Sequence, residues 1–103
     1  MFEKDISLNA YKLLCLIYKE YLIRCDTLPK EAAKEFLDIP ETVYEYIKES
    51  DCYEYLVELK DNGLIKMSVD GSFELKNSAI VVMENRFKKG FSDVAEFLSK
   101  FIP

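Results

Sequence analysis

The spacing of apolar residues changes at Gly63, and this change constrains the fold more than any other feature of the sequence. Residues 50–62 repeat apolar side chains at the helical period, whereas residues 64–69 and 72–76 alternate apolar and polar side chains as strands do. Asp70-Gly71 separates the two alternating runs. An Asp-Gly pair in this position is typical of a β-hairpin with a type I′ turn, in which both central residues have positive φ. The sequence therefore predicts a helix that ends at Gly63 and a hairpin that follows it.

Four helical segments are expected before the hairpin. Residues 6–24 are apolar around almost the whole helical circumference, so this helix is either central to the fold or one half of a dimer seam. A second helix begins at Pro29. Its apolar side chains are Ala32, Ala33, Phe36 and Leu37. A third segment extends from Pro40 to Glu49, and Ser50 is the expected N-cap of the fourth.

Two more helices are expected after the hairpin. Asn77 or Ser78 can cap the first of them, and Gly90 ends it. Ser92 can cap the last, whose apolar face consists of Val94, Phe97, Leu98 and Phe101. Because this last helix is amphipathic, it must cover an apolar surface.

This order of elements predicts one domain over residues 1–103, of the α+β class and mostly helical. A two-stranded hairpin is marginally stable by itself, so it must pack against the helices. The small architecture that best meets this condition is a winged helix-turn-helix with a two-stranded β-hairpin wing and additional N- and C-terminal helices. A plain helical bundle with an inserted hairpin is the alternative.

Three stretches carry a family resemblance, namely Leu56–Ile65, Asp70–Leu75 and Met83–Asn85. Together they resemble small bacterial and phage winged-helix proteins of the YjcQ-like kind, over Val57 to Asn85. In those proteins a helix ending in glycine leads into the wing, and a Leu-Thr-x-x-Gly step opens the next helix. Here Lys76 stands in place of the threonine and Ala79 in place of the glycine. The resemblance implies a winged-helix fold and a regulatory role, and it supplies no site.

The chain contains no histidine, which removes the commonest catalytic and metal-binding designs. Its cysteines, Cys15, Cys25 and Cys52, form no Cys-x-x-Cys pair. Cys52 lies near an expected helix N-terminus, which favours a thiolate, although neighbouring acids oppose this and ordinary packing is the simpler role. We therefore expect a protein without enzymatic activity, cofactor or metal.

The N-terminus lacks the features of a secretory signal, because Met1–Asp5 has no basic start followed by an apolar segment. The longest apolar run, Leu13–Tyr18, is far shorter than the roughly 20 residues of a membrane span. We expect a soluble, cytoplasmic protein that does not contact a membrane.

The distribution of charge bears on whether the protein binds DNA. The net charge is -5, and residues 29–62 hold ten acidic and four basic side chains. This region includes the helix that a winged helix-turn-helix inserts into the major groove, where acids repel phosphates. A DNA-binding transcriptional regulator is therefore the alternative function. Its candidate nucleic-acid contacts are Lys66, Lys76, Arg86, Lys88 and Lys89.

The acidic region is also rich in tyrosine, a residue that is enriched at protein interfaces. We expect a regulatory module that acts mainly through protein contacts, either with another protein or as a homodimer joined by the first and last helices. The candidate interface residues are Tyr46, Tyr53, Tyr55, Leu98 and Phe101. Some of the tyrosines can instead belong to the core.

Overall fold

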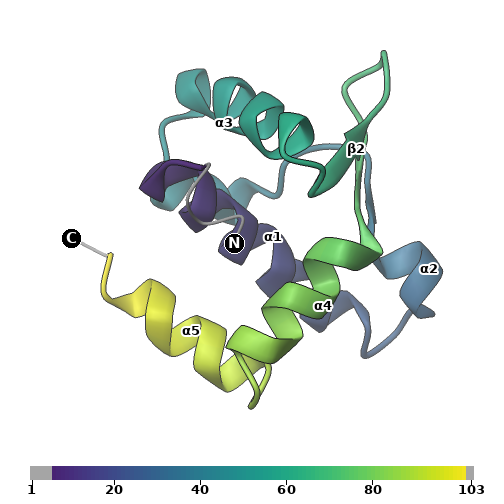
Figure 1. Cartoon of the computed structure of the whole chain (residues 1–103), viewed down its shortest axis with the longest axis vertical. Coiled ribbons are helices and arrows are strands. Elements are labelled where there is room, and N and C mark those ends of the chain that lie inside the picture. The colour runs from purple at the N-terminus through teal and green to yellow at the C-terminus, as the bar shows by residue number, and fades with distance from the viewer. Residues whose placement is uncertain (1–5, 102–103) are drawn as a thin grey trace.

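The computed structural model describes residues 6–101 and has an α+β arrangement with a small antiparallel sheet (Figure 1). Its helices are α1 (Leu8–Arg24), α2 (Lys30–Ala33), the 3-10 helix η2 (Glu41–Glu45), α3 (Glu49–Asp61), α4 (Asn77–Arg86) and α5 (Phe91–Ser99). Its strands are β1 (Glu35–Phe36), β2 (Ile65–Met67) and β3 (Phe73–Leu75), in the spatial order β1-β3-β2. None of the helices within residues 6–101 has the length and apolar content that a membrane span requires.

The helix α1 is the centre of the fold. Ser7 caps it, because the Ser7 hydroxyl accepts a hydrogen bond from the Ala10 N–H at 3.1 Å. Nine of its residues are buried: Ala10, Tyr11, Leu13, Leu14, Cys15, Leu16, Ile17, Tyr18 and Tyr21. The helices α3 and α5 both pack against α1 (Figure 1). The nearly continuous apolar surface of this helix is thus covered within one chain.

The predicted helix end at Gly63 is confirmed. Gly63 has φ of +75°, and its N–H donates to the Lys60 carbonyl oxygen at 3.0 Å. The Leu64 N–H donates to the Leu59 carbonyl oxygen at 3.0 Å. These two bonds form a Schellman motif, which satisfies carbonyl groups that the end of α3 would leave unpaired. The strand β2 begins at Ile65, directly after this motif.

The predicted hairpin is confirmed, but the predicted turn type is wrong. Within residues 6–101 only glycines have positive φ, so Asp70 lacks the conformation that a type I′ turn requires. The Gly71 N–H instead donates to the Ser68 carbonyl oxygen at 3.1 Å, and the Ser68 N–H donates to the Ser72 carbonyl oxygen at 2.9 Å. The loop therefore has three residues, with Gly71 at φ of +93° after the turn. The Asp70 carboxylate accepts hydrogen bonds from the backbone N–H and hydroxyl of Ser72, which lower the Asp70 pKa.

The sheet contains a strand that the sequence did not predict. Phe36 was expected in the second helix, but that helix ends at Ala33, and Phe36 pairs with Phe73 in β3. The two rings stack with centroids 5.1 Å apart. The Leu75 N–H donates to the Lys34 carbonyl oxygen at 2.9 Å, which extends the pairing by one residue. Stacking and pairing with a distant segment thus override a short helical pattern, and the sheet has three strands rather than two.

Other predicted helix limits also need correction. The segment expected as a helix from Pro40 to Glu49 contains only the 3-10 helix η2. The expected caps Ser50, Asn77 or Ser78, and Ser92 lie inside their helices rather than before them. The residues that precede those helices are Lys48, Lys76 and Gly90, none of which makes a side-chain capping bond. The helix α4 ends at Arg86, ahead of the expected stop at Gly90.

The last helix α5 covers α1, so the expected dimer seam is occupied within the chain. Leu98 is 1% exposed, and the Tyr11 and Phe97 rings meet edge to face at 5.7 Å. The centres of the Phe97 and Phe101 rings lie 5.2 Å apart, and the Lys12 ammonium group lies 4.9 Å from the centre of the Phe101 ring. A homodimer that used the apolar faces of α1 and α5 would have to separate these contacts.

The position of β1 can be tested with two neighbouring substitutions. We expect Phe36→Ala to lower the free energy of unfolding by about 3 kcal/mol, because it removes a buried stacked ring. We expect Leu37→Ala to change it by no more than about 0.5 kcal/mol, because Leu37 is 91% exposed. Urea unfolding of both variants measures the difference, and equal losses would contradict the assigned strand.

Candidate protein-interaction site

The outward face of α3 is an exposed part of the acidic region. Cys52, Leu56 and Leu59 face the core and are buried. The opposite face exposes Tyr53, Glu54, Lys60 and Asp61, and we call these four residues the outer α3 face. Lys60 forms a salt bridge of 3.8 Å with Asp61. Because Lys60 is the only cation of α3 and is paired with Asp61, the face offers no unpaired cation to a phosphate.

The other side of α3 is bound to the start of α1. The Ser7 backbone N–H and hydroxyl both donate to the Glu58 carboxylate, and the Asn9 amide donates to the Tyr55 hydroxyl at 3.0 Å. A carboxylate at a helix N-terminus is favoured by the helix dipole. Glu58 therefore belongs to the fold and adds little to the charge that a partner meets.

The sequence-predicted interface residues do not form one surface. Tyr53 is 67% exposed, whereas Tyr46 and Tyr55 are half-buried against the core. Leu98 of α5 is in the core, and Phe101, which follows the end of α5, packs on Phe97. The helices α3 and α5 lie on different sides of α1 (Figure 1). Of the five predicted residues, Tyr53 alone belongs to the outer α3 face.

The candidate nucleic-acid contacts are also divided between two places. Lys66 lies on β2 opposite Glu74, and Lys76 immediately precedes α4. Arg86 lies at the far end of α4, with its guanidinium 5.3 Å from the centre of the Tyr11 ring. The ten residues of α4 span about 15 Å, and Lys88 and Lys89 follow them. These five cations therefore do not make one continuous basic surface beside α3.

A buried lysine that the sequence pattern did not single out joins α2, β3 and α4. The Lys34 ammonium group lies 3.0 Å from the Glu31 carboxylate and 3.7 Å from the Glu74 carboxylate, and it donates to the Asn77 side-chain oxygen at 3.1 Å. The hydrogen bond to Glu31 is the main reason that the Lys34 pKa is raised. Glu31 is a local partner, but Glu74 and Asn77 come from distant parts of the sequence, so the burial of Lys34 has no local signal.

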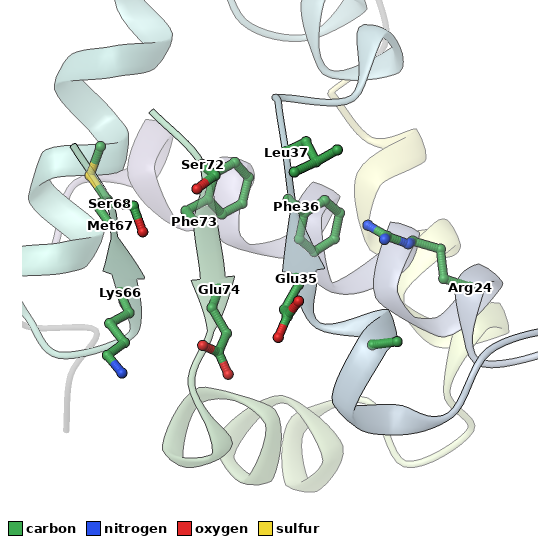
Figure 2. A pocket seen from close by; sticks show the side chains of 11 residues that line it. Arg24, Glu35, Phe36, Leu37, Lys66, Met67, Ser68, Ser72, Phe73 and Glu74 are labelled. Atoms are coloured by element: carbon green, nitrogen blue, oxygen red, sulfur yellow. The ribbon is translucent and has the colours of Figure 1, made fainter. Parts of the chain in front are cut away.

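A cavity of about 510 Å³ opens over the sheet. It is lined by Arg24, Ala32, Glu35, Phe36, Leu37, Lys66, Met67, Ser68, Ser72, Phe73 and Glu74. Figure 2 shows Lys66, Glu74 and Glu35 side by side, one on each strand, and Arg24 beside Phe36. The Arg24 guanidinium lies 4.5 Å from the centre of the Phe36 ring, which fixes it at the rim. We call this cavity the sheet depression.

No group of three or more Cys, Asp or Glu side chains within residues 6–101 could hold a metal ion. The three cysteines are free thiols. Burial raises the Cys15 pKa to about 12, and burial together with Asp51 and Glu49 raises the Cys52 pKa. The thiolate that a helix N-terminus can favour is thus opposed at Cys52 by its surroundings.

Ellman's reagent tests this description of the thiols. At pH 8 we expect Cys15 and Cys52 to stay protonated and to react only after unfolding, because both are buried with raised pKa values. Half-buried Cys25 is expected to react first in the native protein. The Cys25→Ser variant should then show no fast reaction, and a remaining fast thiol would contradict the burial of the other two.

Comparison of the chain with known protein families, curated proteins and solved structures gave no match.

Proposed function

We propose that this protein is a non-enzymatic winged-helix module with a regulatory role that acts through protein contacts. The order α1, α2, β1, η2, α3, β2, β3 and the sheet order β1-β3-β2 support a winged helix-turn-helix in which the single turn of α2 is inserted between α1 and β1. In this assignment η2 stands for the second helix, α3 for the groove-reading helix and the β2–β3 hairpin for the wing. The helices α4 and α5 are additions. The resemblance to YjcQ-like proteins, over the Gly63 helix end and the wing, agrees with the same assignment.

The outer α3 face is the observation that carries the proposal. A winged helix-turn-helix presents this helix to its target, and here the target would meet Tyr53 beside Glu54 and Asp61. An exposed tyrosine offers a large contact area at low entropic cost, and a surrounding negative charge selects a positively charged partner. The protein surface that best complements this face is basic.

DNA is a poor complement to the same helix. Phosphate neutralisation by Lys and Arg supplies most of the affinity of such complexes, and the only cation of α3 is paired with Asp61. The basic residues of the wing and of the α4 end lie apart from each other.

A homodimer through α3 is also a poor complement. A two-fold interface places each patch against its own copy, so the acids of α3 would face acids. A different protein with a basic surface is therefore the proposed partner.

A pull-down comparison tests the proposed surface. We expect immobilised wild-type protein and a control variant, Glu96→Lys on the exposed side of α5, to retain the same identified protein from a cell extract. The double variant Tyr53→Ala Glu54→Lys should lose it, because the contact area and the charge of the outer α3 face both change. Mass spectrometry identifies the retained protein, and purified components confirm direct binding.

Retention that is unaffected by the α3 substitutions would overturn the proposal. So would salt-dependent binding of wild-type protein to duplex DNA, measured by fluorescence anisotropy, if Lys66→Glu or Arg86→Glu weakened it. That second result would favour the alternative of a DNA-binding regulator.

A further inference from the structure

The junction between α3 and β2, Asn62-Gly63, is a chemically labile link of the chain. The asparagines of the sequence are Asn9, Asn62, Asn77 and Asn85, and Asn62 alone is followed by glycine. The backbone nitrogen of the residue after an asparagine can attack the side-chain carbonyl carbon of that asparagine. Glycine favours this attack because it has no side chain to hinder the close approach. The junction therefore has the composition of a deamidation site.

Deamidation at this junction would proceed in two steps. In the first, the Gly63 nitrogen forms a bond to the Asn62 side-chain carbonyl carbon, and the bond from that carbon to the side-chain nitrogen breaks. The side-chain nitrogen leaves as ammonia and takes up the proton that Gly63 loses, and a five-membered succinimide ring remains. In the second step water opens the ring. The product is aspartate, or isoaspartate, in which the main chain passes through the former side chain.

The folded end of α3 keeps the reacting groups apart. The Gly63 N–H is bonded to the Lys60 carbonyl oxygen at 3.0 Å, although the reaction needs this proton to leave. The Asn62 side-chain nitrogen donates to the Glu58 carbonyl oxygen at 2.9 Å, which holds the carboxamide against the preceding turn. At Asn62 the angle ψ of 8° aligns the backbone nitrogen with the Gly63 nitrogen, whereas a closed ring needs the Cα–Cβ bond in that position. Both hydrogen bonds and this angle must change before the ring forms.

The Schellman motif controls these three conditions together. The Leu64 N–H donates to the Leu59 carbonyl oxygen at 3.0 Å and closes the motif around Gly63. Leu59 and Leu64 are 0% and 4% exposed, so packing in the core holds the motif closed. Single elements of a protein open at a lower free energy than the whole domain does. Opening of this one turn would release the Gly63 N–H and the carboxamide while the rest of the fold stays intact.

We propose that Asn62-Gly63 is a deamidation site that the closed end of α3 protects and that local opening of this turn activates. The modification would add a carboxylate at the joint and, in isoaspartate, one more main-chain carbon between α3 and β2. The wing would then be displaced from the outer α3 face. The inference does not depend on the identity of any partner, so it stands apart from the proposed function.

Incubation at pH 8, followed by peptide mapping with mass spectrometry, tests the proposal. The reference is the blocked peptide Lys-Asp-Asn-Gly-Leu, which has the sequence of residues 60–64. We expect Asn62 in the folded protein to deamidate at least about tenfold more slowly than the peptide, which corresponds to an opening free energy of about 1.4 kcal/mol. In concentrated urea Asn62 should react at the rate of the peptide. The Asn62→Gln variant should give no acidic product at this position, because its ring would need six members.

Two matched core substitutions separate local opening from global unfolding. Leu64→Ala removes a buried side chain from the motif, and Leu98→Ala removes the same buried side chain from α5. We expect Leu64→Ala to accelerate deamidation of Asn62 by about tenfold and Leu98→Ala to accelerate it by less than about twofold. Circular dichroism verifies that both variants are folded. The milder pair Leu64→Val and Leu98→Val replaces them if either is not.

Three results would overturn the proposal. Deamidation of the folded wild type at the rate of the peptide would contradict the protection by α3. Acceleration by Leu64→Ala that is no greater than that by Leu98→Ala would contradict activation by local opening. An acidic product of Leu64→Ala that maps only to other asparagines would contradict the assignment of the site to Asn62.

Discussion

The burial of α1 is the constraint on which the rest of the structure depends. A helix with apolar side chains on nearly every side must be covered on every side, because exposed apolar area costs about 25 cal/mol per Å². One side receives α3, which the Ser7–Glu58 bonds also tie to the start of α1. Another side receives α5, through Phe97 and Leu98. The C-terminal helices therefore complete the core, and they leave the outer α3 face exposed.

Sequence patterns predict the parts of this fold that depend on local chemistry. The end of α3 at Gly63 follows from the positive φ that glycine tolerates, and the hairpin follows from alternation on both sides of Asp70-Gly71. The amphipathic last helix follows from its own period. Caps are predicted less well, because the capping bonds expected from Ser50 and Ser92 are not made and the helices begin at earlier residues.

The parts that depend on distant residues are not predictable in the same way. Phe36 has a helical spacing from Ala32 and Ala33, but its ring stacks on Phe73, 37 positions further along the chain. Lys34 looks solvated in sequence and is buried by Glu31, Glu74 and Asn77. The candidate site shares this limit: the charge of α3 can be counted from the sequence, whereas the sheet depression exists only because β1 joins the hairpin.

The short strand β1 therefore decides both the winged-helix assignment and the row of Glu35, Glu74 and Lys66. Without it, the chain would be a helical bundle with a two-stranded hairpin. The most direct measurement is a nuclear Overhauser spectrum of the protein in solution. The account predicts a strong cross-strand contact between the α-protons of Glu35 and Glu74, which form a close non-hydrogen-bonded pair. Helical contacts from Ala33 to Phe36, with no contact between Glu35 and Glu74, would contradict it.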